Sequence, residues 1–141
     1  MGDLALIAMP GAELFAEKID FYLKEWNNSS SSFILSTSLI RFLTGDSKAV
    51  LEESARSKDV FIISDPYNYS VTYDMRGVEN HMSPDDHLQN IIRIISAING
   101  KTSDISVLMT MLYGSRQDAR HMRESLDCAM ALQQLGMCFI S

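Results

Sequence analysis

Three arginines lie close together where an apolar segment gives way to a predicted helix. Arg116, Arg120 and Arg123 fall within eight residues, directly after Gly114 and Ser115. Phosphate oxygens need directed hydrogen-bond donors, and guanidinium groups together with the free amides of a helix start provide several. The spacing therefore predicts a polyphosphate-binding loop, and this loop is the best candidate for chemistry in the sequence.

The same loop also fits an interpretation without a ligand. Asp118, Glu124 and Asp127 lie among the arginines and could pair with them in a solvated, charged turn. A cluster of arginines after a glycine is a weak motif, and composition does not decide between the two interpretations. The polyphosphate site is therefore a hypothesis that other residues must support.

The histidines offer a second kind of candidate site. His81 and His87 bracket a predicted helix start, and His121 lies among the arginines. A metal site would need further ligands at a regular spacing, which this sequence does not show, so solvated or capping histidines are favoured. The sequence also lacks the G-x-x-x-x-G-K, G-x-G-x-x-G and G-x-S-x-G motifs, which argues against several common enzyme classes.

The elements that would position the basic loop alternate between apolar runs and amphipathic segments. We expect strands at residues 4–9, 59–64, 105–111 and 137–140, and helices at residues 12–26, 83–99 and 123–135. This alternation implies an α/β fold, with a mostly parallel sheet that helices cover on both faces. The basic loop then follows the carboxyl end of a strand, where open α/β sheets bind ligands.

Smaller features complete the expected architecture. Residues 33–42 and 49–53 favour a small β-hairpin with its tip at residues 44–46. Ser83 is a good N-cap for the helix that follows it. The first helix carries one apolar stripe that we expect to pack on the sheet, formed by Phe15, Ile19, Tyr22 and Trp26.

Residues 66–82 are expected to form a long polar loop. Loops of this length inside a compact domain are usually functional or partly disordered. Tyr67, Tyr69 and Tyr73 lie in this segment and could stack on a nucleotide base, although aromatic loop residues more often cover the edge of a core.

Composition argues against several classes of partner. The chain has 141 residues, 46% of them hydrophobic, which is enough for one domain with a core. A net charge of −6 argues against a nucleic-acid surface, which needs clustered Lys and Arg. The apolar run 4–9 follows Asp3 and stops at Pro10, so it is too short for a signal peptide or a membrane span. Cys128 and Cys138 lack metal-ligand spacing, which favours reduced thiols and a cytoplasmic protein.

Several motifs occur in an order that one enzyme family shares. Residues 59–64 read D-V-F-I-I-S, a helix is expected at 83–99, and the next strand runs into Y-G-S-R-Q-D at 113–118. Upstream, residues 41–46 read R-F-L-T-G-D. This arrangement resembles the amino-terminal half of ribose-phosphate pyrophosphokinases, or phosphoribosyl pyrophosphate synthases. That family carries an R-Q-D motif after the corresponding strand and a nucleotide-contacting hairpin of the form F-x-(N/D)-x-E.

The resemblance implies a phosphoribosyltransferase-like fold and an enzyme that transfers diphosphate from ATP to ribose 5-phosphate with Mg²⁺. By resemblance, Arg116 and Gln117 would contact ATP, and Arg120 would lie near its phosphates. Phe42 and Asp46 would come from a neighbouring protomer and complete the adenine pocket. The implied partners are therefore ATP, ribose 5-phosphate and further copies of the chain in a homo-oligomer.

The sequence also departs from the family pattern. Thr44 stands where the family has Asn or Asp, and His121 stands where it has an acidic residue. The family continues with a D-x-H motif and a second domain that binds ribose 5-phosphate. We therefore expect residues 1–141 to be a single amino-terminal domain that holds part of the ATP site and is inactive alone. The alternative, which the departures favour, is a non-catalytic regulatory or assembly protein of the synthase-associated type.

Overall fold

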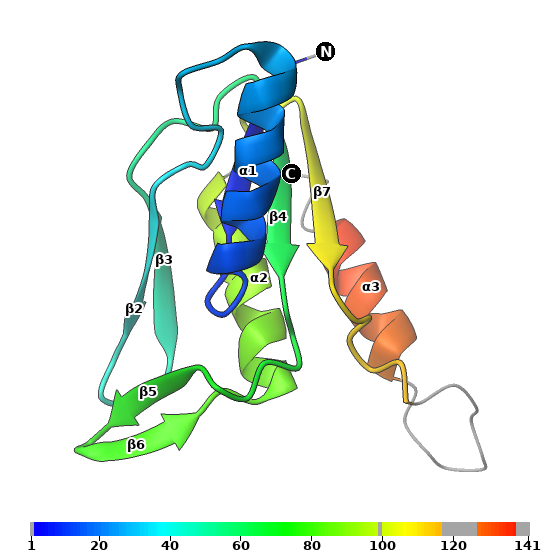
Figure 1. Cartoon of the computed structure of the whole chain (residues 1–141). Helices are drawn as coiled ribbons and strands as arrows, with labels where there is room; N and C mark the ends of the chain where they lie inside the picture. Colours follow the sequence, from blue (N-terminus) through cyan, green and yellow to red (C-terminus); the bar gives the residue numbers. More distant parts are fainter. Residues whose placement is uncertain (1, 99, 117–126, 138–141) are drawn as a thin grey trace.

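Three parallel strands form the centre of the part of the molecule that the structure describes (Figure 1). The computed structural model describes residues 2–98, 100–116 and 127–137. The strands are β1 (Asp3–Ala8), β4 (Lys58–Ser64) and β7 (Asp104–Met109), in the order β1-β4-β7. The register pairs Ile7 with Ile62 and Ile62 with Val107. The carboxyl ends of the strands therefore meet at one edge of the sheet, as the sequence predicts.

Helices cover both faces of this sheet. Neighbouring residues of a strand point to opposite faces, and Leu6 and Ile7 accordingly belong to two different hydrophobic cores. α1 (Glu13–Asn27) packs on the face of Leu6 through Ala16. α2 (Pro84–Ile98) and α3 (Asp127–Met137) contribute to the core on the face of Ile7. The predicted α/β fold with helices on both faces is thus confirmed.

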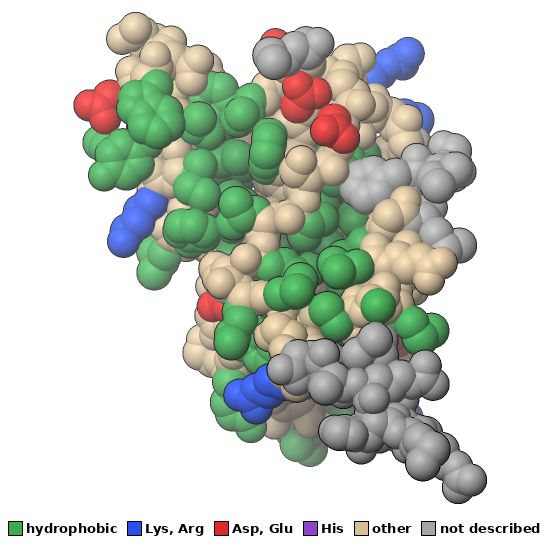
Figure 2. All heavy atoms as spheres, turned by 90° about the vertical axis from the view of Figure 1, so that its right-hand side faces the viewer, with side chains coloured by type: hydrophobic (Ala, Val, Ile, Leu, Met, Phe, Trp, Pro, Cys, Tyr) green, Lys and Arg blue, Asp and Glu red, His purple; other side chains and the backbone are tan. Residues whose placement is uncertain are grey.

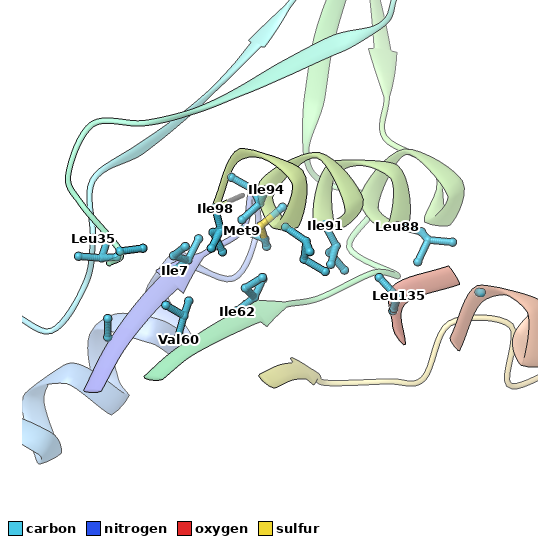
Figure 3. Packing of buried hydrophobic residues seen from close by; sticks show 14 residues of the cluster. Ile7, Met9, Leu35, Val60, Ile62, Leu88, Ile91, Ile94, Ile98 and Leu135 are labelled. Carbon is cyan, nitrogen blue, oxygen red and sulfur yellow. The ribbon is translucent and has the colours of Figure 1, made fainter. Parts of the chain in front are cut away.

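The larger of the two cores lies between the sheet and α2. Figure 3 shows Ile7 of β1 and Val60 and Ile62 of β4 beside Ile91 and Ile94 of α2, and all five are buried. Burying one such side chain contributes about 1.5–3 kcal/mol, so this contact fixes α2 against the strands. The first turn of α2 in turn contacts two segments of the candidate site, through Asp85 and Asp86.

The predicted apolar stripe of α1 is only partly correct, because Ile19 packs against the core on the face of Leu6 but the aromatic residues are exposed. Phe15, Tyr22 and Trp26 are 42%, 52% and 73% exposed, and the buried residues of the helix are Ala16 and Asp20. Small side chains allow the helix to approach the sheet closely. Asp20 is buried because it accepts a hydrogen bond from the Phe33 amide at 2.7 Å and so fixes the chain after the helix.

Exposed apolar residues also occur on the β7 side of the molecule. Figure 2 faces this side and shows hydrophobic side chains spread across its surface. The exposed large apolar residues in β7 and the segment directly after it include Leu108, Met111 and Leu112.

The predicted hairpin is formed by β2 (Thr37–Arg41) and β3 (Ser47–Leu51), which pair antiparallel. β3 begins two residues before the predicted segment. Before β2, Ile34 makes a single parallel bridge with Leu6 and so continues the central sheet beyond β1.

The expectation of a long loop at residues 66–82 is wrong, because this segment contains a second hairpin. β5 (Thr72–Met75) and β6 (Val78–His81) pair antiparallel across a turn at Arg76 and Gly77. Both turn residues have positive φ, +56° and +81°, which is the arrangement of a type I′ turn. Figure 1 shows this hairpin beside the tip of β2–β3.

The start of α2 confirms the predicted cap. The Ser83 hydroxyl accepts a hydrogen bond from the Asp86 amide at 3.2 Å, and the Asp86 carboxylate accepts one from the Ser83 amide at 2.9 Å. These reciprocal bonds form a capping box.

The last predicted helix is observed as α3, which begins at Asp127 in the described residues. Met137 ends this helix rather than starting a strand, and residues 117–126 and 138–140 lie outside the described residues.

Candidate functional site

The segment after β7 is tied to the neighbouring strand where it leaves the sheet. The Thr110 amide donates to the Ser64 carbonyl at 3.1 Å, and the Thr110 hydroxyl donates to the Asp65 carboxylate at 2.7 Å. β4 and β7 therefore end together, and the following turn starts from a fixed position at the carboxyl edge of the sheet.

Two tyrosines then hold the turn at residues 112–116. The Tyr113 hydroxyl donates to the Asp85 carboxylate in the first turn of α2 at 2.6 Å. The Gly114 amide donates to the Tyr67 hydroxyl at 3.1 Å. The turn is closed by a bond from the Ser115 amide to the Leu112 carbonyl at 3.2 Å. Tyr67 thus supports this turn rather than a ligand base.

The Tyr113 phenol is kept protonated by its surroundings. Its hydrogen bond to Asp85 raises its pKa first, and partial burial and the nearby charges of Asp85, Asp127 and Tyr67 raise it further, to about 12. The hydroxyl therefore keeps its proton, and can donate to Asp85, up to a higher pH than an ordinary tyrosine. Its role in the turn is to position the backbone that carries Arg116.

Gly114 is required at its position in this turn. Its φ is +70°, and an added Cβ would lie 3.1 Å from Cβ and 3.2 Å from the backbone nitrogen of Cys128 in α3. Only glycine allows α3 to approach the turn so closely.

Arg116 follows directly and is exposed, and its side chain makes no hydrogen bond or ion pair with another described residue. None of the residues that the structure describes therefore occupies its guanidinium donors. The other predicted residues of the basic loop, Gln117 and Arg120, lie outside the described residues, as do His121 and Arg123.

The structure brings Phe42 and Asp46 together at the tip of the β2–β3 hairpin. The Phe42 amide donates to the Asp46 carbonyl at 2.8 Å, and the Gly45 amide donates to the Phe42 carbonyl at 2.9 Å. Gly45 has a φ of +94°, which suits glycine. The Phe42 ring is 44% exposed, and the Asp46 carboxylate accepts a hydrogen bond from the Thr44 hydroxyl. An aromatic face and a carboxylate are thus presented on one turn.

This tip and the basic turn do not form one pocket within the chain. Figure 1 shows the β2–β3 hairpin and the segment after β7 on opposite sides of the molecule, with α2 and β4 between them. Arg116 and the residues of the hairpin tip can therefore contact the same ligand only if they come from different copies of the chain.

A cleft lies beside the basic turn, between α2 and α3. Its volume is about 550 Å³, which is within the range of small-molecule sites. It is lined by Leu88, Tyr113, Asp127, Met130, Ala131, Gln133 and Gln134. Sequence reasoning missed Asp85 and the residues of α3 that line this cleft, because their roles arise from contacts between elements far apart in the chain.

Two histidines, His81 and His87, lie in the described residues, and they differ in burial. His81 is exposed, as expected, and its ring stacks on Tyr69 with the centroids 4.1 Å apart. His87 is not a solvated residue but is only 2% exposed, and its Nε2 lies 3.0 Å from the Asn68 carbonyl oxygen. It joins α2 to the segment before β5.

The described residues do not include a group that fits a metal ion. No cluster of three or more His, Cys, Asp or Glu side chains suited to a metal occurs in residues 2–98, 100–116 and 127–137. Within the same described ranges, no helix has the length and apolar character that a membrane span requires.

Comparisons with known proteins place these features in context. Residues 4–138 match the family model of the N-terminal domain of ribose phosphate pyrophosphokinase. The crystal structure of phosphoribosylpyrophosphate synthetase from Mycobacterium smegmatis has a similar fold, with a TM-score of 0.71 and 18% sequence identity. The match covers 96% of this chain and 39% of that chain, so this chain spans about two fifths of that protein. No curated protein sequence matches the chain.

Proposed function

Because the chain belongs to the family of N-terminal domains of ribose phosphate pyrophosphokinases, we propose that it forms part of the ATP site of a diphosphate-transferring enzyme. The reaction would move diphosphate from ATP to ribose 5-phosphate. The observation that carries the proposal is the turn at residues 112–116, which is held by α2 and α3 and presents an exposed Arg116 that has no hydrogen-bond or ion-pair partner among the residues that the structure describes. A guanidinium group with free donors at the carboxyl edge of a parallel sheet suits a phosphate ligand.

The residues of the basic turn have distinct roles in this proposal. Arg116 donates charge-assisted hydrogen bonds to ATP, and Arg120 lies near its phosphates. Gln117 carries both a donor and an acceptor and reads the edge of the base. Tyr113 and Gly114 do not contact ATP but hold the turn. Transfer of a phosphoryl-type group depends mainly on positioning and charge neutralisation, which is what such a turn provides.

The hairpin tip supplies the adenine contact from a second copy of the chain. The exposed ring of Phe42 stacks on the base, and Asp46 accepts a hydrogen bond from it. The separation of this tip from Arg116 within one chain supports an arrangement between protomers. The proposal therefore includes a homo-oligomer in which each ATP site is shared.

ATP binding measured by calorimetry tests the role of Arg116. Removing a charge-assisted hydrogen bond costs about 1.5–3 kcal/mol, so Arg116→Ala should weaken ATP binding about 10- to 150-fold. Lys101→Ala is the matched control, because it removes one exposed cation before β7 rather than after it. Equal ATP affinity in the wild-type and Arg116→Ala proteins would refute the proposed site.

Mixing two variants tests whether the site is shared. Phe42→Ala and Arg116→Ala should each bind ATP weakly when alone. In an exchanged equal mixture, about one quarter of the sites should recover both intact residues if protomers pair at random. ATP binding can recover only if the two variants exchange subunits. Mass measurement of the oligomers, with the subunits of one variant labelled, shows whether they do. An exchanged mixture that binds no better than either variant would exclude the shared site.

One observation favours a non-catalytic relative of the enzyme as a second candidate. Thr44 donates its hydroxyl hydrogen bond to Asp46, and so engages the carboxylate that would otherwise face the base. A regulatory protein of this kind would bind ATP but form no product. Assay of AMP release by the full-length protein, with ATP, ribose 5-phosphate and Mg²⁺, separates the two functions. AMP release at a rate that Arg116→Ala reduces would support the enzyme.

A further inference from the structure

Arg41 connects the tip of the β2–β3 hairpin to β5 and to α2. It is the last residue of β2, and its guanidinium carbon lies 3.9 Å from the centroid of the Tyr73 ring in β5. Its Nη1 donates to the Gly45 carbonyl within the tip and to the Asp86 carboxylate at 3.4 Å in the first turn of α2. One side chain therefore contacts the tip, the second hairpin and α2.

These contacts are shielded from solvent. The side chains of Arg41 and Asp86 are 13% and 24% exposed, so the pair is screened less than a surface ion pair. Asp86 is itself held by Ser83, whose amide and hydroxyl donate to the same carboxylate oxygen at 2.9 Å and 3.0 Å. Arg41 therefore meets an anion whose position is already fixed by the helix cap.

The second hairpin also packs against the back of the tip. A Cβ added to Gly45 would lie 2.9 Å from the sulfur atom of Met75 in β5, so the two hairpins are in close contact there. Within the same tip, Phe42 and Leu43 are 44% and 71% exposed. The tip is thus supported by the second hairpin at Gly45, while the predicted ligand-contacting residue Phe42 is exposed.

The second hairpin is anchored well enough to act as a support. Its base is closed by a bond from the Met82 amide to the Val71 carbonyl at 2.8 Å. The segment before it is fixed by Asn68, whose side-chain nitrogen donates to the Gly11 carbonyl at 3.1 Å. Asn68 also contacts the buried His87 of α2 through its carbonyl oxygen. These contacts connect β5–β6 to the end of β1 and to α2.

We propose that the β5–β6 hairpin is a positioning element for the β2–β3 tip, and that Arg41 and Tyr73 form the clamp between them. The clamp holds residues 42–46 in the conformation that presents Phe42 and Asp46 to a nucleotide base. The ligand rests on the function proposed above, whereas the clamp itself is a property of this chain that can be measured without nucleotide. Arg41 and Tyr73 are positioning residues and do not contact the ligand.

The chemistry of the clamp requires arginine rather than a cation in general. A guanidinium group is flat, so its face can stack on Tyr73 while the donors on its edge reach Gly45 and Asp86. A lysine ammonium is a point charge on a flexible stem and cannot make these contacts together. Arg41→Lys should therefore keep the charge but lose most of the positioning.

Amide hydrogen exchange measured by NMR on the full chain tests the clamp. The reporters are the Phe42 and Gly45 amides, which are hydrogen-bonded within the tip. Arg41→Met and Tyr73→Leu should each raise their exchange rates about 2- to 30-fold, the range of a cation–π contact. Lys48→Met is the control, because it removes an exposed cation of the same hairpin whose side chain forms no ion pair or cation–π contact with another described residue. Amides of α2 report whether each variant is folded.

ATP affinity provides the second readout and separates the two proposals. Faster exchange at the tip in Arg41→Met, Arg41→Lys and Tyr73→Leu, together with weaker ATP binding, supports both the clamp and its role. Unchanged exchange in folded Arg41→Met and Tyr73→Leu overturns the clamp, whatever the ATP affinity. Faster exchange with ATP binding that is unaffected even by Phe42→Ala leaves the clamp standing and overturns the nucleotide role of the tip.

Discussion

Substituting Gly114 tests how firmly α3 holds the basic turn. An alanine there must adopt a φ of +70°, which costs about 1–2 kcal/mol for an L-residue. Its methyl group would also lie 3.1–3.2 Å from Cβ, Cα and N of Cys128, and such overpacking costs about 1–3 kcal/mol more. We therefore expect Gly114→Ala to lower the free energy of unfolding by about 2–5 kcal/mol.

Gly77→Ala is the matched control for this substitution. Gly77 has a similar φ of +81°, but an added Cβ would meet no atom within 4 Å. For this variant the free energy of unfolding should fall only by the cost of a positive φ in an L-residue, about 1–2 kcal/mol. Urea denaturation followed by circular dichroism measures both variants, and the difference between them is the cost of contact with Cys128.

The comparison has an outcome that would refute the reasoning. If the two variants lose the same stability, α3 yields to the added methyl group and does not hold the turn. In that case Arg116 would not be positioned by the Gly114 contact, and the proposed ATP site would lose one of its two supports. If Gly114→Ala alone is more destabilised, its ATP affinity should also fall, because the turn that carries Arg116 must shift.

Three further predictions concern stability and pH. Ile91→Ala should destabilise the fold by about 2–5 kcal/mol in urea denaturation, because Ile91 is fully buried against the sheet. Burial raises the pKa of Asp86, but hydrogen bonds from Ser83 and the charge of Arg41 outweigh it and hold the pKa below the ordinary 3.8. Asp86 therefore stabilises the fold above pH 3.8 and loses this effect as pH falls further, so Asp86→Asn should flatten the acid limb of a stability–pH curve. The pKa of Tyr113 is raised from 10.0 to about 12. Its protonated hydroxyl therefore contributes fully to the stability of the fold below pH 10, and this contribution is lost toward pH 12. Urea midpoints across that alkaline range should fall less in Tyr113→Phe than in the wild type.

The parts of the fold that follow from local chemistry could be predicted from the sequence. Residues 59–64 form a strand because an apolar, β-branched run suits a buried parallel sheet. Ser83 caps α2 because its hydroxyl satisfies a free amide at the helix start. Each of these signals depends on residues within one turn or one strand, so no knowledge of distant contacts was needed.

The parts that the sequence analysis missed depend on competing or non-local effects. The β5–β6 turn uses Arg76 where Asn is the usual signal before glycine, the two strands have only four residues each, and β6 is mostly polar. The aromatic stripe of α1 has the right spacing to be buried, but Ala16 and Asp20 occupy the buried face instead. Periodicity identifies that a helix is amphipathic without deciding how close its backbone lies to the sheet.

The candidate site shows the same division. Arg116 could be chosen from its motif, and Phe42 and Asp46 are brought together by a local turn. Their supports could not be identified, because Tyr67 and Tyr73 act across elements that are distant in the sequence. In the sequence these tyrosines could stack on a base or, more often for aromatic loop residues, cover the edge of a core, whereas in the structure Tyr67 holds the basic turn and the Tyr73 ring lies beneath Arg41.

The first turn of α2 connects the two halves of the candidate site. Asp85 accepts the hydrogen bond from Tyr113 that fixes the basic turn, and Asp86 accepts the bond from Arg41 that fixes the hairpin tip. In the sequence these adjacent carboxylates suggest only a favourable interaction with the helix dipole. In the structure each one holds a different segment, on opposite sides of the molecule. Under the proposed function, a shift of this turn would therefore alter both the proposed phosphate contact of one shared site and the proposed base contact of another. In the proposed oligomer α2 would therefore position two binding segments through its first turn, in addition to packing its buried face on the sheet.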